Sequence, residues 1–299
     1  MTTENLYPHL NEQTKALINE SDEARIAFIR GGTWLNYPWA KEALAKLEDL
    51  LAYPKITRMP NLLLVAPSFN GKTSILERFV AQHPAIVDPE GEKSICEVVM
   101  IEAPPTPDAS AFYSRILDAL MAVYKPTAST QAKNSQIKIL FEQLGVKMLI
   151  IDEIHHLIAG SLNRQKDFRN ALKSLGNETK IVIVASGIED AFTAFNTDPQ
   201  MSSRFTPFEL PTWKANNQFG ALLATLELKT PLKKPSNLKS PEKMQQIFYR
   251  TEGTLGDMHD FFKELAVNAI RTSAEEITLE AINTLDWVPP SKRKQYRRF

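Results

Sequence analysis

Short, uninterrupted apolar runs alternate with longer amphipathic stretches through the middle of the chain. A continuous apolar run of this length is typical of a strand buried on both faces of a parallel sheet. The strand candidates are residues 61–66, 97–102, 147–152, 180–186 and 207–210. The stretches with apolar residues at helical spacing lie near 72–82, 109–124, 132–144, 164–175 and 188–195. This alternation predicts an α/β fold with a five-stranded parallel sheet flanked by helices.

Both ends of the chain are predicted to be helical. Residues 10–30 and 38–52 precede the first strand, and more helical segments follow residue 213. These later segments are residues 214–228, 241–251, 257–272 and 278–286. We therefore divide the 299 residues into an N-terminal helical arm (1–55), an α/β core (56–212), a C-terminal helical lid (213–286) and a basic tail (287–299).

The first predicted strand leads into a phosphate-binding loop and then a helix. The P-loop pattern is G-x-x-x-x-G-K-[ST], in which backbone N–H groups and the lysine bind phosphates and the hydroxyl binds Mg²⁺. Gly71, Lys72 and Thr73 match this pattern, while Ala66 replaces the first glycine. Asn70 tolerates unusual backbone angles, which suits such a loop. The residues predicted to contact the nucleotide are Ala66, Pro67, Ser68, Phe69, Asn70, Gly71, Lys72, Thr73 and Ser74.

The third predicted strand ends in two carboxylates and resembles a Walker B element. In this interpretation Asp152 binds Mg²⁺ together with Thr73, and Glu153 orients and deprotonates the attacking water. The alternative is an ordinary buried strand followed by acidic residues at a helix start. Because the P-loop and the Walker B-like element occur in the order strand, loop and helix, a nucleotide site is favoured over this alternative. ATP and Mg²⁺ are the predicted cofactors.

Composition and charge narrow the class of protein. No apolar run approaches the length of a membrane span, and the first residues lack a signal-peptide pattern, so we expect no membrane association and a cytoplasmic location. The single cysteine, Cys96, cannot form an internal disulfide.

Net charge is zero, yet the last eight residues carry five cations and no anion. Such a tail is typical of a segment that contacts DNA phosphates or an acidic partner, and equally of a terminus that is only solvated.

A helical lid after a five-stranded nucleotide core is the layout of the AAA+ ATPases, which these motifs resemble. The resemblance implies a γ-phosphate sensor at Ser186, with a plain strand end as the alternative. It also implies an arginine finger at Arg204 that completes a neighbouring subunit's site, with a local ion pair as the alternative. In the lid, His259 stands where relatives carry a phosphate-binding arginine after a Gly-Asp step.

A more specific resemblance is to the TniB family of bacterial transposition ATPases, which are relatives of TnsC. It extends from about residue 25 to the tail. The segments that carry it are residues 34–38, 58–65, 70–73, 149–155, 176–178, 204–205 and 252–254.

This resemblance implies an ATP-dependent regulator of transposition in the bacterial cytoplasm. Such a protein assembles with itself on duplex DNA as a hexameric ring or helical filament, and links a TniQ-like targeting protein to a DDE transposase of the TniA or TnsB kind. ATP hydrolysis then drives disassembly. The chain itself shows no convincing Asp, Asp, Glu set of a transposase. Candidates for DNA contact, by position only and with solvated surface charge as the alternative, are Arg115, Lys125 and Lys133.

Two other interpretations stay open at this stage. Another DNA-associated AAA+ ATPase, such as a helicase loader or replication initiator, would share every catalytic residue named. An initiator normally adds a recognisable DNA-binding domain, and the last 85 residues show no convincing one. A nucleotide-gated adaptor that holds ATP without hydrolysing it is the second alternative. Glu153 counts against it, because a binding switch does not need the base.

Overall fold

Five parallel strands form the centre of one of the two units into which the chain divides. The computed structural model describes residues 6–87, 94–158, 161–196 and 199–293. The core unit is Pro38–Pro211, and the helical unit combines Met1–Tyr37 with Thr212–Phe299. The strands are β1 (Asn61–Val65), β2 (Val98–Glu102), β3 (Met148–Asp152), β4 (Val182–Gly187) and β5 (Phe205–Glu209). Their order in the sheet is β2-β3-β4-β1-β5, which confirms the predicted five-stranded parallel sheet.

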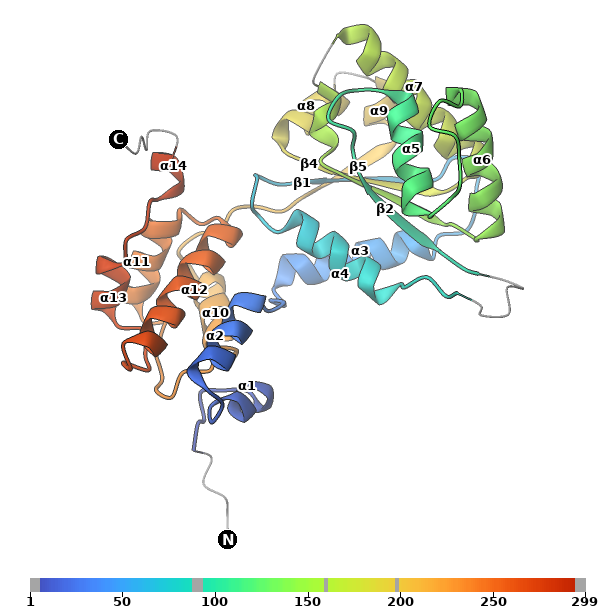
Figure 1. The fold of residues 1–299 in the computed structure, drawn as a ribbon. Helices are drawn as coiled ribbons and strands as arrows, with labels where there is room; N and C mark the ends of the chain where they lie inside the picture. Colours follow the sequence, from blue (N-terminus) through green and yellow to red (C-terminus); the bar gives the residue numbers. More distant parts are fainter. Residues whose placement is uncertain (1–5, 88–93, 159–160, 197–198, 294–299) are drawn as a thin grey trace. The chain divides into compact units, whose positions relative to one another are not determined.

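Helices cover both faces of this sheet. Figure 1 shows α3 and α4 on one face and α5, α6 and α7 on the other. The helices of the core unit are α3 (Pro38–Leu51), α4 (Lys72–Gln82), α5 (Ala109–Ala119), α6 (Thr130–Gln143), α7 (Leu162–Thr179), α8 (Glu189–Asn196) and α9 (Pro199–Ser202). A short 3₁₀ helix, Ile154–Ile158, follows β3. β1, β3 and β4 are buried along their whole length, which explains why they read as apolar runs, whereas the outer strands β2 and β5 have exposed residues.

Side chains that alternate along the strands divide between the two faces of the sheet. On the face of α5 to α7, Leu63, Leu149 and Ile183 pack with Phe112 and Phe168, and all five are at most 2 % exposed. The helices begin where polar side chains cap them. Asp108 accepts a hydrogen bond from the Ala111 amide at the start of α5, and Ser129 accepts one from Ala132 at α6. This packing fixes the positions of the strand ends from which the loops extend.

The helical unit contains the N-terminal residues as well as the C-terminal helices. Its helices are α1 (Glu12–Leu17), α2 (Asp22–Gly31), α10 (Asn217–Leu228), α11 (Pro241–Thr251), α12 (Leu255–Arg271), α13 (Leu279–Thr284) and α14 (Pro290–Arg293). The single helix predicted over 10–30 is two helices, because Ser21 caps the start of α2 and accepts from the Ala24 amide. No helix among the described residues is long and apolar enough to cross a membrane.

The predicted boundary at residue 55 differs from the division that the structure shows. Helix α3 belongs to the core unit, whereas α1 and α2 pack with the C-terminal helices. Arg25 on α2 is fully buried there and forms two hydrogen bonds with Glu275, at 2.8 Å (Nη1 to Oε2) and 2.6 Å (Nη2 to Oε1). Helices α1 and α2 are therefore part of the helical unit. Of the predicted basic tail, residues 294–299 lie outside the described residues.

Candidate nucleotide site

The loop between β1 and α4 has the backbone geometry of a phosphate-binding loop. Gly71, at the cap of α4, has a φ of 85°, and Phe69 has a φ of 62° with its ring more than half exposed. The left-handed residues of this loop are thus Phe69 and Gly71, whereas Asn70 has no positive φ. Free N–H groups at the start of α4 face the loop and form a site suited to an anion.

Asn70 has a different role, which is to anchor the loop. Its side-chain amide donates to the carbonyls of Leu210 (3.1 Å) and Pro211 (3.2 Å), just after β5. Ala66 is buried, and its φ is not positive, so nothing in this backbone requires the glycine of the usual pattern. Its amide donates to the carbonyl of Gly187 at the end of β4 (3.2 Å). The loop is therefore tied to the strands on both sides of β1.

Lys72 lies inside the loop it follows. Its ammonium donates to the carbonyls of Ala66 and Pro67, both at 2.9 Å, and the residue is 5 % exposed. Burial lowers the pKa of this ammonium, while the nearby Glu153 and Asp152 carboxylates act in the opposite direction. A phosphate would offer this charge stronger partners than two carbonyls do.

The two predicted Mg²⁺ ligands are in direct contact. The Thr73 hydroxyl donates to Asp152 Oδ2 at 2.6 Å, although 79 positions separate the two residues. The other oxygen, Oδ1, accepts from the Glu153 amide at 2.9 Å, and Asp152 is 4 % exposed. A hydroxyl and a carboxylate held together beside a helix N-terminus are oxygen ligands that suit Mg²⁺ bound to phosphates. The donor set therefore fits the predicted metal.

Glu153 and Ser186 complete the carboxyl edge of the sheet. Glu153 has a φ of 55°, and its carboxylate Oε2 lies 3.0 Å from His155 Nδ1. Ser186 is fully buried on β4, beside Leu64 of β1, and its hydroxyl has no hydrogen-bond partner among the described residues. A buried hydroxyl without a partner is unusual and calls for an explanation, which a bound ligand would supply. The structure thus brings Lys72, Thr73, Asp152, Glu153 and Ser186 to one edge of the sheet.

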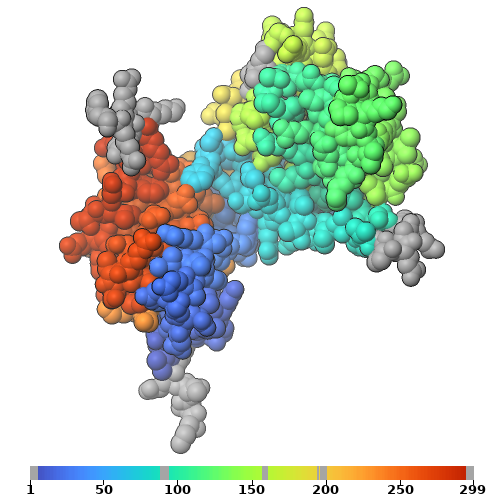
Figure 2. All heavy atoms as spheres, in the orientation of Figure 1, coloured from blue at the N-terminus to red at the C-terminus, as the bar shows by residue number. Residues whose placement is uncertain are grey.

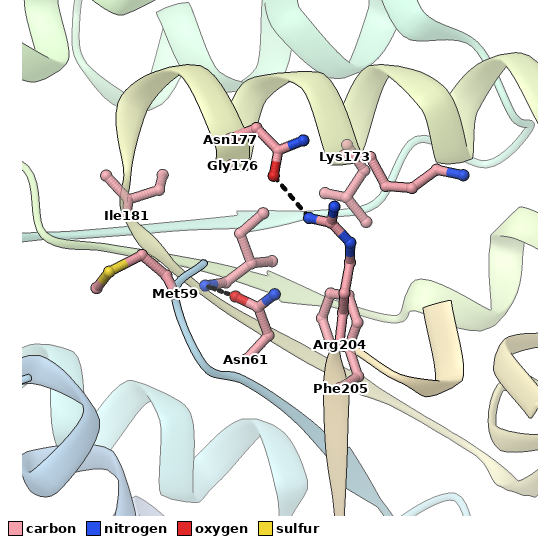
Figure 3. Close-up of a pocket in the computed structure, with 10 residues that line it drawn as sticks. Met59, Asn61, Lys173, Gly176, Asn177, Ile181, Arg204 and Phe205 are labelled. Atoms are coloured by element: carbon pink, nitrogen blue, oxygen red, sulfur yellow. Dashed lines mark hydrogen bonds between the residues drawn. The ribbon is translucent and has the colours of Figure 1, made fainter. Parts of the chain in front are cut away.

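Arg204 lies at the opposite edge. It directly precedes β5, whose first residue, Phe205, pairs with Asn61 at the start of β1, whereas the P-loop follows the end of β1. Five residues of strand span about 16 Å, so Arg204 does not reach the P-loop of its own chain. Its Nη1 donates to the side-chain oxygen of Asn177 at 2.6 Å (Figure 3). Within the described part of the chain this partner is a neutral amide, and no ion pair of Arg204 is found.

The candidates for DNA contact fall into two groups. Arg115 on α5 and Lys125 in the turn after it are exposed. Lys133 is 3 % exposed, and its ammonium donates to the Ser110 and Ser114 hydroxyls, both at 2.9 Å. Lys133 therefore joins α6 to α5 inside the core unit. Its selection as a DNA contact is corrected on this ground.

In the helical unit, the Gly-Asp step opens helix α12. Asp257 is buried and lies 2.5 Å from Arg293 Nη1. Burial lowers the pKa of His259, and the Lys263 ammonium one turn later acts in the same direction. His259 is therefore biased towards the neutral form, unlike the arginine that relatives carry there. No group of three or more His, Cys, Asp or Glu in the described ranges could hold a metal ion.

A family model described as "Bacterial TniB protein" matches residues 25–215. The chain belongs to the TniB family. This match covers most of α2 and the whole core unit, including every residue of the candidate nucleotide site. No curated protein matches the chain.

Solved structures show the same fold as this TniB protein. Aeropyrum pernix ORC2 in its ADPNP–ADP complexes is 14 % identical, with a TM-score of 0.57, over 81 % of this chain and 65 % of that chain. Drosophila ORC bound to DNA has 14 % identity, a TM-score of 0.54 and coverage of 89 % and 65 %. Pyrobaculum aerophilum Cdc6p has 17 % identity, a TM-score of 0.54 and coverage of 81 % and 65 %. The chain spans just under two thirds of the length of these proteins. These likenesses show that the chain shares its fold with these ORC and Cdc6 proteins.

Proposed function

We propose that this TniB protein is an ATP-dependent regulator of transposition that assembles on duplex DNA and hydrolyses ATP between neighbouring subunits. The observation that carries the proposal is the division of the catalytic residues between two opposite edges of one sheet. Lys72, Asp152 and Glu153 lie at the carboxyl edge, and Arg204 lies at the amino edge. One copy alone therefore has an incomplete site, which a second copy completes.

The residues at the carboxyl edge have distinct roles in this proposal. Lys72 and the N–H groups of the loop bind the phosphates of ATP, and Glu153 orients and deprotonates the attacking water. Thr73 and Asp152 would hold Mg²⁺, which offsets negative charge on the phosphate oxygens when it is bound. Ser186 donates its hydroxyl to the γ-phosphate or to the attacking water. This contact gives its buried hydroxyl the partner that it lacks among the described residues.

A head-to-tail arrangement follows from the position of Arg204. If the amino edge of one subunit meets the carboxyl edge of the next, the contact is heterologous, and such contacts form rings or helical filaments. The arginine then stabilises the charge that develops on the transferred phosphoryl group. This contribution is worth about 10³ to 10⁵ in rate in related chemistry. A hexameric ring or a helical filament is the assembly that we propose.

Family membership supports the partners in this proposal. We assign duplex DNA as the surface on which the subunits assemble, and a TniQ-like targeting protein and a DDE transposase as the proteins that the assembly connects. Arg115 and Lys125 remain the proposed DNA contacts, because both cations are exposed. Hydrolysis dismantles the assembly and releases the DNA. The Drosophila ORC neighbour is itself described as bound to DNA, which agrees with a DNA-associated ATPase.

Electron microscopy with linear duplex DNA tests the proposal. Wild type, Glu153→Gln and Arg204→Ala are compared with ATP, a non-hydrolysable analogue, ADP and no nucleotide. Rings or filaments on DNA are expected only with the triphosphates, and Glu153→Gln is expected to keep them after wild type has disassembled. Free subunits with DNA in every nucleotide state would contradict the proposal, as would identical lifetimes for wild type and Glu153→Gln assemblies.

A further inference from the structure

The last turn of α7 lies beside Arg204, and nucleotide chemistry gives its residues 176–178 no role. Gly176 lets the helix approach β4 closely, because a Cβ there would meet Ile183 Cδ1 at 3.0 Å. Glu178 accepts hydrogen bonds from Lys138 of α6 (2.7 Å) and from the Ser174 hydroxyl. The position of Asn177 between these two residues is therefore well fixed.

Asn177 and Arg204 point toward each other across a small pocket at the amino edge of the sheet (Figure 3). The carbonyl oxygen of Asn177 accepts from Arg204 Nη1 at 2.6 Å. The backbone before the arginine is held as well. The Arg204 amide donates to the Met201 carbonyl (2.9 Å), and Arg58 Nη2 donates to the carbonyl (2.8 Å) and hydroxyl (2.9 Å) of Ser203.

The type of side chain at 177 suits this contact. A guanidinium has five N–H donors in a rigid fork, so one bond to Asn177 orients the group and leaves other donors for a phosphate. An amide oxygen carries no net charge, so the full positive charge of Arg204 stays available. A carboxylate in the same place would offset that charge and form the local ion pair that a finger must avoid.

We propose that Asn177 is a positioning residue, which holds the Arg204 guanidinium ready for the nucleotide of the neighbouring subunit. This inference rests on the proposed function, because it has meaning only if Arg204 acts on a second copy of the chain. Asn177 does not touch the nucleotide itself. Its effect passes through the arginine of the same subunit, and this property makes it testable apart from folding.

Mixed assemblies on duplex DNA provide the test. Glu153→Gln subunits keep Arg204 but lack the base, and Arg204→Ala subunits keep the base but lack the arginine. In an equal mixture, turnover therefore occurs only where a Glu153→Gln subunit offers its arginine to an Arg204→Ala subunit. The Asn177→Leu substitution keeps a similar side-chain size and removes the hydrogen-bond acceptor. It is then introduced into the Glu153→Gln subunits or into the Arg204→Ala subunits.

We expect Asn177→Leu to lower kcat by roughly tenfold to a hundredfold on the arginine-donating subunit, because a misplacement of about 1 Å has effects of this size. The KM for ATP is expected to stay unchanged. On the Arg204→Ala subunit the same substitution is expected to have no effect. Asn170→Leu is the matched control, because Asn170 is an exposed asparagine two turns earlier on α7. Sedimentation with DNA confirms equal assembly, and Asn177→Ala provides a second variant.

The outcomes separate the two proposals. If the parent mixture assembles but does not hydrolyse ATP, Arg204 does not act between subunits, and the proposed function fails with the inference. If the parent mixture is active and Asn177→Leu acts equally on both partners, its role is structural and only the inference fails. Unchanged or raised turnover with the substitution on the donating subunit overturns it as well.

Discussion

Two residues at the candidate nucleotide site have features that lower the stability of the folded chain. Ser186 buries a hydroxyl without a partner among the described residues, which costs about 1–3 kcal/mol. Glu153 has a positive φ without being a glycine, and residues in such backbone regions cost on the order of 1–3 kcal/mol. Both flank the Thr73–Asp152 contact. These costs indicate that the edge is arranged for a ligand rather than for stability.

Replacement of Ser186 by alanine is expected to separate stability from turnover. The variant loses the proposed phosphate contact and with it at least tenfold in ATP hydrolysis, the equivalent of about 1.4 kcal/mol. It also loses an unsatisfied hydroxyl, so the free energy of unfolding of the core unit should rise by up to about 1 kcal/mol. Urea unfolding and steady-state ATPase measurements check both parts. Lower stability together with normal turnover would argue for a plain strand end.

Lys72→Ala is expected to weaken ATP binding by about a hundredfold or more, because hydrogen bonds that involve a charged group contribute about 1.5–3 kcal/mol each. Titration with a fluorescent ATP analogue measures the Kd. Lys41→Ala, at an exposed lysine of α3, is the control that removes one charge from the core unit elsewhere. Equal affinity of the Lys72→Ala and Lys41→Ala variants would reject the P-loop assignment.

At the scale of elements, a buried ion pair joins α2 to the C-terminal part of the helical unit. Arg25 also donates to the Pro231 carbonyl (3.0 Å) and to the Asp22 carboxylate (2.8 Å). Burial by itself raises the pKa of Glu275, but the hydrogen bonds from Arg25 and from the Lys233 amide bring it below its usual value. The contribution of the pair is therefore present above the unfolded pKa of the glutamate. It is lost as the pH falls through the folded value.

Arg25→Leu is expected to destabilise the helical unit by about 3 kcal/mol, because it removes both guanidinium hydrogen bonds from the buried Glu275 carboxylate and leaves it only the Lys233 amide and the more distant Lys233 ammonium. Asp22→Asn is the control, since the Asp22 side chain is 58 % exposed and its contact with Arg25 should contribute about 0–1 kcal/mol. Thermal unfolding at neutral pH, followed by circular dichroism, compares the two variants. A similar loss of stability in both variants would show that the buried Glu275 carboxylate is not the main cause of the destabilisation.

For the whole molecule, the proposed function makes ATP hydrolysis a property of the assembly, because Arg204 lies away from the P-loop of its own chain. Turnover per subunit is expected to rise steeply with protein concentration, because dilution removes the neighbour that supplies the arginine. Arg204→Ala is expected to show low turnover at every concentration, with ATP affinity unchanged. ATPase assays over a dilution series measure this. A constant specific activity in wild type would mean that each chain carries a complete site.

The sequence by itself determined most of the sheet and which residues lie together at the candidate nucleotide site. β1, β3 and β4 are buried along their whole length, and such strands need continuous apolar runs, so the sequence showed them clearly. β5 carries exposed Thr206, Pro207 and Glu209, so its apolar signal is weak and its start was predicted two residues late. The P-loop and the Asp152–Glu153 pair were visible because their chemistry requires fixed residue types directly after a strand. Helix ends were less exact, since a single capping residue such as Ser21 divides one helical pattern into two.

Tertiary structure decided what depends on residues far apart in the chain. Asn177 and Arg204 meet through the close packing of α7 on β4, and Arg25 and Glu275 meet across 250 positions. Lys133 reads as a surface cation until the fold places its ammonium between two serine hydroxyls. The local sequence pattern predicts which face of a helix or strand is apolar. Only packing sets which polar groups come within hydrogen-bonding distance, because that distance depends on how separate elements are brought together.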